Sequence, residues 1–141
     1  MSLKKLLFAT LASAIIMIVL GGLWHTVIMA DFYAEGRNVV RDEPLMGFVA
    51  VGMFVLALLM SYVYPRGASH LSPVAGGARF GAVMGLVYVL PHGLVLHGIQ
   101  SDSTATLVLV DAIWHVVEQG VGGIAIALVY AAGAGEAEMP A

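Results

Sequence analysis

Five ionisable side chains lie within stretches of sequence that are otherwise apolar. They are His25, His92, Asp111, His115 and Glu118. A charged side chain at the centre of a membrane helix costs about 2.5–3.5 kcal/mol on insertion scales, so such residues need partners and by default suggest a functional site. We therefore expect these side chains to point into a helical membrane protein and to form one polar cluster.

Asp111, His115 and Glu118 have a spacing that strengthens this expectation. They stand at i, i+4 and i+7, which are positions on one face of an α-helix. Ile113 and Val117 fall on the opposite side of the same helix and suit lipid. The pattern predicts that this helix turns a polar stripe inward.

A metal site is the first chemistry that the cluster could form. His25, His92 and His115 would supply three imidazole nitrogens. Asp111 or Glu118 would add a carboxylate oxygen. This set suits a divalent transition metal such as zinc, copper, nickel or iron. No local motif such as His-Glu-x-x-His accompanies it, so the prediction depends on how the helices pack.

Two other chemistries use the same residue types. Histidines and carboxylates that alternate from the membrane surface toward its middle could pass protons. Haem b held between His92 and His115 is the third possibility, but it would leave Asp111 and Glu118 without a role.

The composition indicates what surrounds these residues. Of the 141 residues, 60% are hydrophobic and only 11% are charged, with a mean hydropathy of +0.95. A soluble domain carries charge on about a quarter of its residues. The net charge of −3 includes no basic run, so nucleic acid is not an expected partner. The absence of cysteine excludes thiolate metal sites and cysteine-held iron–sulfur clusters.

Four apolar stretches are long enough to span a hydrocarbon core of about 30 Å, which takes about 20 residues of helix. They cover residues 6–30, 45–64, 80–99 and 104–132. The predicted fold class is therefore all-α, an integral membrane four-helix up-down bundle that forms one domain over residues 1–141.

In up-down order, three of these helices bring ionisable groups to one half of the membrane. At a rise of about 1.5 Å per residue, His25 lies about 7 Å, and His92 and Asp111 about 10 Å, inside the same membrane face. His97 is expected at the membrane interface and His70 in a solvated loop. The loop from Asp31 to Pro44 is expected to fold as a cap over the cluster, with its first residues continuing the first helix.

Lysine and arginine counts predict the orientation. Cytoplasmic loops carry an excess of these residues. Four lie on the side of the termini and two on the other side: Lys4, Lys5, Arg66 and Arg79 against Arg37 and Arg41. Both termini are therefore predicted to be cytoplasmic.

Four short runs resemble a group of small four-helix bacterial inner-membrane proteins of unknown function. The runs are Gly22-Leu23-Trp24-His25, Glu43-Pro44, the segment from Gly81 to Gly85, and Asp111-Ala112-Ile113-Trp114-His115. The resemblance implies a four-helix fold in a bacterial inner membrane, and it implies no activity and no functional residues.

Four functions remain open. The first is binding or translocation of a metal ion or of protons, and the second is a haem b or quinone-associated redox subunit. The third is an accessory or structural subunit, in which the cluster only fixes the helix register. The fourth is a small enzyme acting on a lipid-like substrate, with His and Glu as acid and base. The expected partners are membrane lipid and either further copies of the chain or other membrane subunits.

Overall fold

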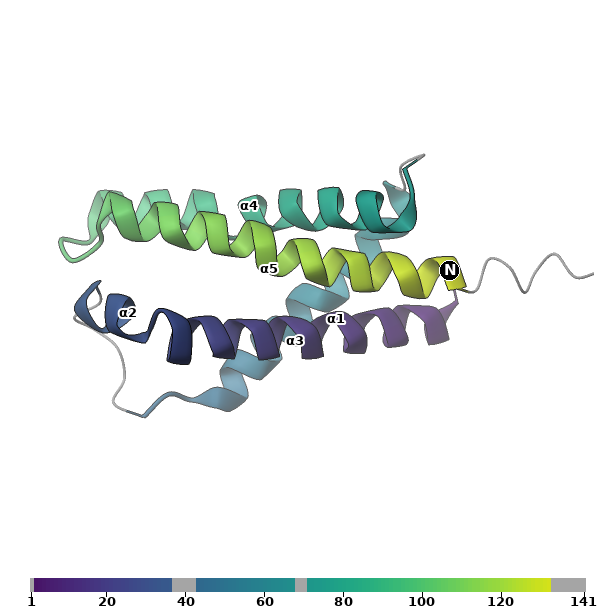
Figure 1. Ribbon diagram of the computed structural model, residues 1–141, viewed down its shortest axis with the longest axis horizontal. Coiled ribbons are helices and arrows are strands. Elements are labelled where there is room, and N and C mark those ends of the chain that lie inside the picture. The colour runs from purple at the N-terminus through teal and green to yellow at the C-terminus, as the bar shows by residue number, and fades with distance from the viewer. Residues whose placement is uncertain (1, 37–42, 68–70, 133–141) are drawn as a thin grey trace, which may run out of the picture.

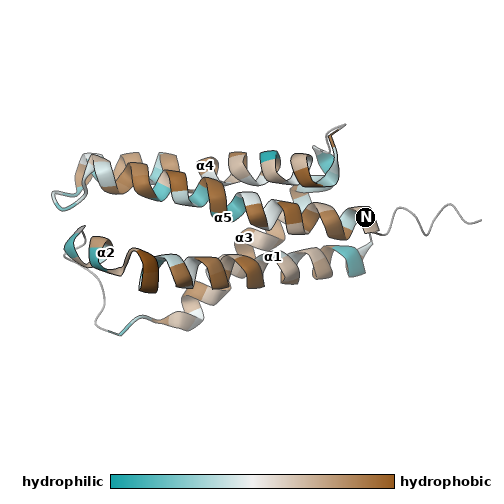
Figure 2. Ribbon diagram, in the orientation of Figure 1, coloured by the Kyte–Doolittle hydropathy of each residue, from teal (hydrophilic) through white to brown (hydrophobic). Residues whose placement is uncertain are grey.

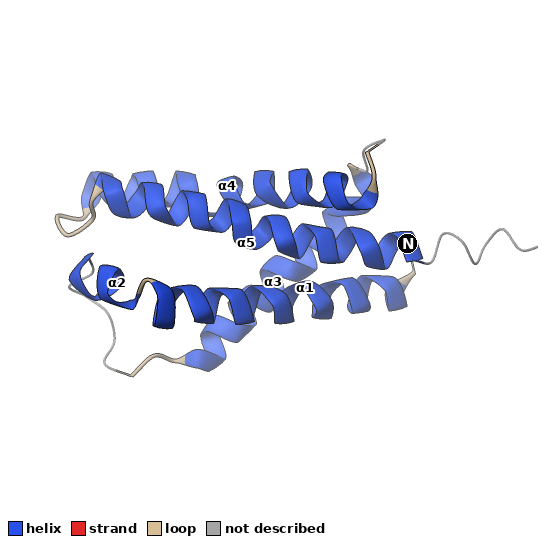
Figure 3. Cartoon of the chain, in the orientation of Figure 1, coloured by secondary structure: helices blue, strands red, loops and turns tan. Residues whose placement is uncertain are grey.

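The computed structural model describes residues 2–36, 43–67 and 71–132, and every regular element within these ranges is a helix (Figure 3). The elements, in chain order, are α1 (Leu3–Leu23), a π-helix η1 (Trp24–Ile28), α2 (Ala30–Gly36), α3 (Met46–Val63), a 3-10 turn η2 (Tyr64–Arg66), α4 (Pro73–Ile99) and α5 (Ala105–Ala132).

Four helical segments in the described ranges are long and apolar enough to cross a membrane. They are Leu3–Ile28, Met46–Arg66, Pro73–Ile99 and Ala105–Ala132. Many of their exposed side chains are large and apolar, which suits lipid and would be unfavourable in water. Hydrophobic residues predominate along the helices in Figure 2. The chain is therefore a multi-pass, all-helical membrane protein, as the sequence predicts.

The third spanning helix differs from its predicted bounds. It begins at Pro73 and not near Phe80. Ser72 accepts a hydrogen bond from the backbone N–H of Ala75 (3.4 Å), and Pro73 occupies the first helical position, which lacks a partner for its N–H in any helix. The additional residues at its start include Gly76 and Gly77, a residue type typical of loops, but both are buried within the helix.

α5 is the central helix. It packs against α4 on one side and α1 on another, while α3 packs mainly on α1. In the most apolar 18-residue stretch of each helix, half of the residues of α5 are buried, against 6% of those of α4. In Figure 1, α1, α4 and α5 run side by side along the long axis and α3 crosses them at an angle.

The two ends of the molecule carry different features (Figure 1). The start of α1 and the end of α5 lie together at one end, here called the termini end. α2 and the turn between α4 and α5 lie at the other, here called the α2 end. A core of Ala9, Ala57, Met17, Met60 and Ile126, each 0% exposed, fills the termini half between α1, α3 and α5.

Glycines set the close contact between α4 and α5. Gly77, Gly81 and Gly85 recur every four residues, so they lie on one face of α4. A β-carbon at Gly81 would overlap the backbone carbonyl of Gln119, and one at Gly85 would overlap the carbonyl of His115. Small residues let membrane helices approach to backbone contact, and here they fix the α5 segment that carries the polar stripe.

Candidate functional site

At the α2 end of α1, side chains compete with the backbone for hydrogen bonds. His25 Nδ1 donates to the carbonyl oxygen of Gly21 (2.9 Å), and Thr26 Oγ1 donates to that of Gly22 (2.7 Å). Such bonds compete with the backbone ladder, and the helix widens here into the π-helix η1. The N–H of Met29 then bonds the carbonyl of Trp24, five residues back (2.8 Å). Single π turns of this kind are often found at functional sites.

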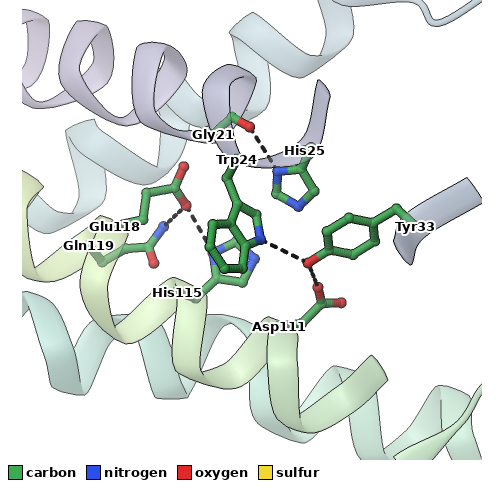
Figure 4. A network of polar contacts seen from close by, with 8 residues as sticks. All are labelled: Gly21, Trp24, His25, Tyr33, Asp111, His115, Glu118 and Gln119. Atoms are coloured by element: carbon green, nitrogen blue, oxygen red, sulfur yellow. Dashed lines mark hydrogen bonds and ion pairs between the residues drawn. The ribbon is translucent and has the colours of Figure 1, made fainter. Parts of the chain in front are cut away.

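The π-helix aims Trp24 at α5 (Figure 4). Its indole stacks on that of Trp114, with ring centroids 4.3 Å apart and 2° between the planes. Trp24 Nε1 donates to the hydroxyl oxygen of Tyr33 (3.1 Å), and the Tyr33 hydroxyl donates to Asp111 Oδ1 (2.5 Å). A chain of hydrogen bonds thus joins α1, α2 and α5.

α2 serves as a cap at this point. Tyr33 is only 7% exposed although it lies on a seven-residue helix, because its ring packs against the imidazole of His25 (centroids 4.7 Å apart) and its hydroxyl reaches Asp111. The described part of the predicted cap therefore does cover the polar residues. Residues 37–42 of the predicted cap lie outside the described residues.

His115 and Glu118 form the deepest polar contact. His115 Nδ1 is 3.0 Å from Glu118 Oε2, and Gln119 Nε2 donates to the same oxygen (2.9 Å) (Figure 4). The side chain of His115 is 14% exposed and that of Glu118 is 1% exposed. Glu118 is thus a carboxyl group enclosed by protein in the middle of a spanning helix, with two nitrogen partners on one oxygen.

The other oxygen of Glu118 faces α1. A β-carbon at Gly21 would lie 2.6 Å from Glu118 Oε1. Only glycine therefore leaves the carboxyl group room in its present position. Position 21 serves the site by having no side chain.

Two buried polar atoms beside this pair have no hydrogen-bond partner among the described residues. They are Gln119 Oε1 and Trp114 Nε1. Buried polar atoms are normally paired with protein or with ordered water. The interior around Glu118 therefore has hydrogen-bonding capacity beyond its direct contacts.

The structure does not bring all the predicted residues together. Asp111 bonds Tyr33 of α2, and His25 lies against the same ring. Glu118 is paired with His115 and faces Gly21 of α1. His92 is exposed on α4, and within the described residues no hydrogen bond or ring contact joins it to the other four. The edge-on neighbour of the His115 ring from α4 is Tyr88 (centroids 5.1 Å apart).

The predicted three-histidine metal site has no support in this geometry. Across residues 2–36, 43–67 and 71–132, no group of three or more His, Cys, Asp or Glu side chains is placed to hold a metal ion. His25 donates through Nδ1 to a carbonyl and His115 is paired with Glu118. The exposed His92 lies apart from both.

The remaining histidines lie elsewhere. His97 is exposed in the last turn of α4, where its Nδ1 donates to the carbonyl of Ser103 (3.0 Å). This position at a helix end suits the predicted interfacial role. His70 lies outside the described residues.

Sequence reasoning missed three members of the site: Trp24, Tyr33 and Gln119. Trp24 directly precedes His25, and Gln119 directly follows Glu118, so both stand beside residues that were singled out. Tyr33 gave no such signal because its role depends on the bend at Met29 between the π-helix and α2.

No protein-family model, curated protein or solved structure matches the chain. The chain is thus defined by its fold and its site, as a multi-pass helical membrane protein with a buried His–Glu pair.

Proposed function

We propose that this membrane protein exchanges protons between the α2 end and the middle of the membrane, with the His115–Glu118 pair as the group that takes up and releases the proton. The observation that carries the proposal is the burial of Glu118, 1% exposed, with His115 Nδ1 3.0 Å from its carboxyl group. A carboxyl and an imidazole in contact can hold one proton on either group, so the pair can take up a proton on one group and release it from the other.

A route from the membrane surface supports this reading. Asp111 lies one turn nearer the α2 end than His115, about 6 Å along the helix. Tyr33, on the cap, donates to Asp111. Groups that can exchange protons therefore follow one another from the cap to Glu118.

A purely structural role explains less of the site. Fixing the register of two helices needs one polar contact, and the Tyr33–Asp111 bond already supplies it. A second carboxyl group at mid-membrane is costly. Gln119 Oε1 and Trp114 Nε1, which have no partner among the described residues, add to that cost.

The other readings draw less support. The metal reading needs His92, which is exposed and apart from the pair. Haem b between His92 and His115 would need space between α4 and α5, but Gly85 packs on the backbone of His115 there. The accessory-subunit reading accounts for the Tyr33–Asp111 bond alone, and nothing in the described part of the chain favours the enzyme reading.

The wider assignments are part of the same proposal. An up-down bundle with cytoplasmic termini is supported by the grouping of Lys4, Lys5, Arg66 and Arg79 toward the termini end. A bacterial inner membrane is supported only by the resemblance of the four short runs.

Infrared difference spectroscopy tests the proposal directly. The full chain, in lipid vesicles, is stepped between acidic and alkaline buffer, and the carboxyl stretching band of a buried acid is followed. We expect a band that is lost in Glu118→Gln and altered in His115→Gln. Asp102→Asn, in the turn before α5, is the matched control and should leave the band intact. A spectrum that Glu118→Gln does not change would refute the proposal.

A further inference from the structure

Three hydroxyl groups of the described residues are buried in the termini half of the interior. Thr10, Ser13 and Ser61 are each 0% exposed. Thr10 Oγ1 donates to the carbonyl of Leu6 (2.8 Å). Ser13 Oγ and Ser61 Oγ have no hydrogen-bond partner within the part of the chain that the structure describes. Because buried hydroxyls are normally paired, these two are suited to binding water.

Ser13 lies one to two helical turns from Glu118, toward the termini end. A β-carbon at Gly122 would be 2.8 Å from Ser13 Oγ, so this hydroxyl rests on the α5 backbone at that level. Gly122 follows Glu118 by four residues, about 6 Å along the helix toward the termini end. One or two water molecules could span that distance.

Met17 lies between Ser13 and Glu118. Ser13, Met17 and Gly21 recur every four residues on the face of α1 that meets α5. Gly21 faces Glu118, and Met17 Sδ would be 2.9 Å from the same β-carbon at Gly122. Met17 is 0% exposed. Its unbranched thioether side chain adopts alternative conformations more readily than a branched one, so it closes the interior here and can still move.

Ser61 lies nearer the termini end. It is in the last turn of α3, where the Tyr130 hydroxyl donates to its carbonyl oxygen (2.9 Å). The exposed Arg66 follows five residues later. The hydroxyl of Ser61 is thus the buried polar group closest along α3 to the surface at that end.

We infer that the proton path continues past Glu118 through water held by Ser13 and Ser61 to the termini end, with Met17 as its gate, so that the protein conducts protons across the whole membrane. The inference rests on the proposed function of the His115–Glu118 pair. A proton leaves the Glu118 carboxyl for a water at Ser13, and each water that accepts one proton releases another. Charge is balanced by the movement of a counter-ion through the bilayer.

Proton flux into liposomes tests the inference. The full chain is reconstituted with a pH-sensitive dye inside, and a potassium gradient with valinomycin supplies the potential and the counter-ion. We expect wild-type flux above that of empty liposomes. Ser13→Ala should reduce it to the empty level, and Ser61→Ala should reduce it as well. Thr10→Val removes an equally buried hydroxyl that is already bonded to the backbone, so flux should be unchanged.

Two variants of Met17 test the gate. Met17→Ala removes the side chain between Glu118 and Ser13 and should raise flux. Met17→Leu keeps a similar volume but has a branched side chain that changes conformation less readily, so flux should fall below that of the wild type. Wild-type flux for Ser13→Ala, or no increase for Met17→Ala in correctly folded protein, would overturn the inference.

The infrared experiment distinguishes a failure of the present inference from a failure of the proposed function. If the Glu118 band is present and wild-type flux equals that of empty liposomes, the path ends at Glu118 and only the present inference is wrong. If the band is absent, the proposed function itself is wrong, and the inference falls with it.

Discussion

The indole rings of Trp24 and Trp114 lie flat against each other, 4.3 Å apart at their centroids and within 2° of parallel. One belongs to the π-helix that ends the first span and the other to the central helix. Trp114 immediately precedes His115, so the stack fixes α1 beside the His–Glu pair. The contact also orients Trp24 Nε1 toward Tyr33.

Replacing Trp24 by leucine should loosen the α2 end. An aromatic pair is worth about 0.5–1.5 kcal/mol beyond its buried area, and the bond to Tyr33 is lost as well. We expect Trp24→Leu to lower the free energy of unfolding in mixed micelles by at least this amount. Trp24→Phe keeps an aromatic ring against Trp114, so its free energy of unfolding should lie between those of Trp24→Leu and the wild type. Equal stability of Trp24→Leu and the wild type would contradict the stacking role.

Tyr33→Phe should release the cap without disturbing the spans. It removes the hydroxyl that joins Trp24 to Asp111, and losing a typical hydrogen bond costs about 0.5–1.5 kcal/mol. We expect faster hydrogen exchange over α2 and unchanged exchange in α5. Tyr62→Phe, on an exposed ring, serves as the control. Protection of α2 that survives Tyr33→Phe would show that other contacts hold the cap.

Hydropathy was sufficient to predict the four spans, and the spacing of Asp111, His115 and Glu118 was sufficient to orient α5. A helix with three ionisable residues on one face has the lowest free energy in a bilayer when that face points toward protein and away from lipid. His92 had no such companions, so its depth was predicted but its rotation was not. At the level of His92, the neighbouring Gly93 meets α5 at Val108, and His92 is left exposed.

Tyr33 shows the limit of reasoning from spacing. Its contact with Asp111 spans 78 positions in the chain. It depends on the backbone widening at Trp24 and bending at Met29, which follow from side-chain bonds to the carbonyls of Gly21 and Gly22. Hydrophobic periodicity carries no information about such local competition for backbone hydrogen bonds.

A methyl group at Gly81 should separate α4 from α5. The new β-carbon would overlap the carbonyl of Gln119, which belongs to backbone and cannot move aside. Overpacking of this kind costs about 1–3 kcal/mol, and we expect Gly81→Ala to lower the unfolding free energy accordingly. Gly52→Ala is the matched control, because nothing lies within 4 Å of its β-carbon. Equal stability of the two variants would contradict the close contact between α4 and α5.

Gly21 and Gly22 offer the sharpest test of the site, because they are neighbours in one helix and differ in what they face. A β-carbon at Gly21 would lie 2.6 Å from Glu118 Oε1, whereas one at Gly22 would meet nothing within 4 Å. Both substitutions by alanine favour the helix equally, by up to about 1 kcal/mol. The difference between the two variants therefore isolates the contact with the carboxyl group.

We expect Gly21→Ala to push the Glu118 side chain from its place beside His115 and to shift the carboxyl band in the infrared difference spectrum. Gly22→Ala should give the wild-type spectrum. Glu118 is a flexible side chain and can move, so Gly21→Ala should fold and retain its helical content, which circular dichroism will verify. If Gly21→Ala folds and its band matches that of Gly22→Ala, then the fit between position 21 and the carboxyl group has no influence on how Glu118 holds its proton.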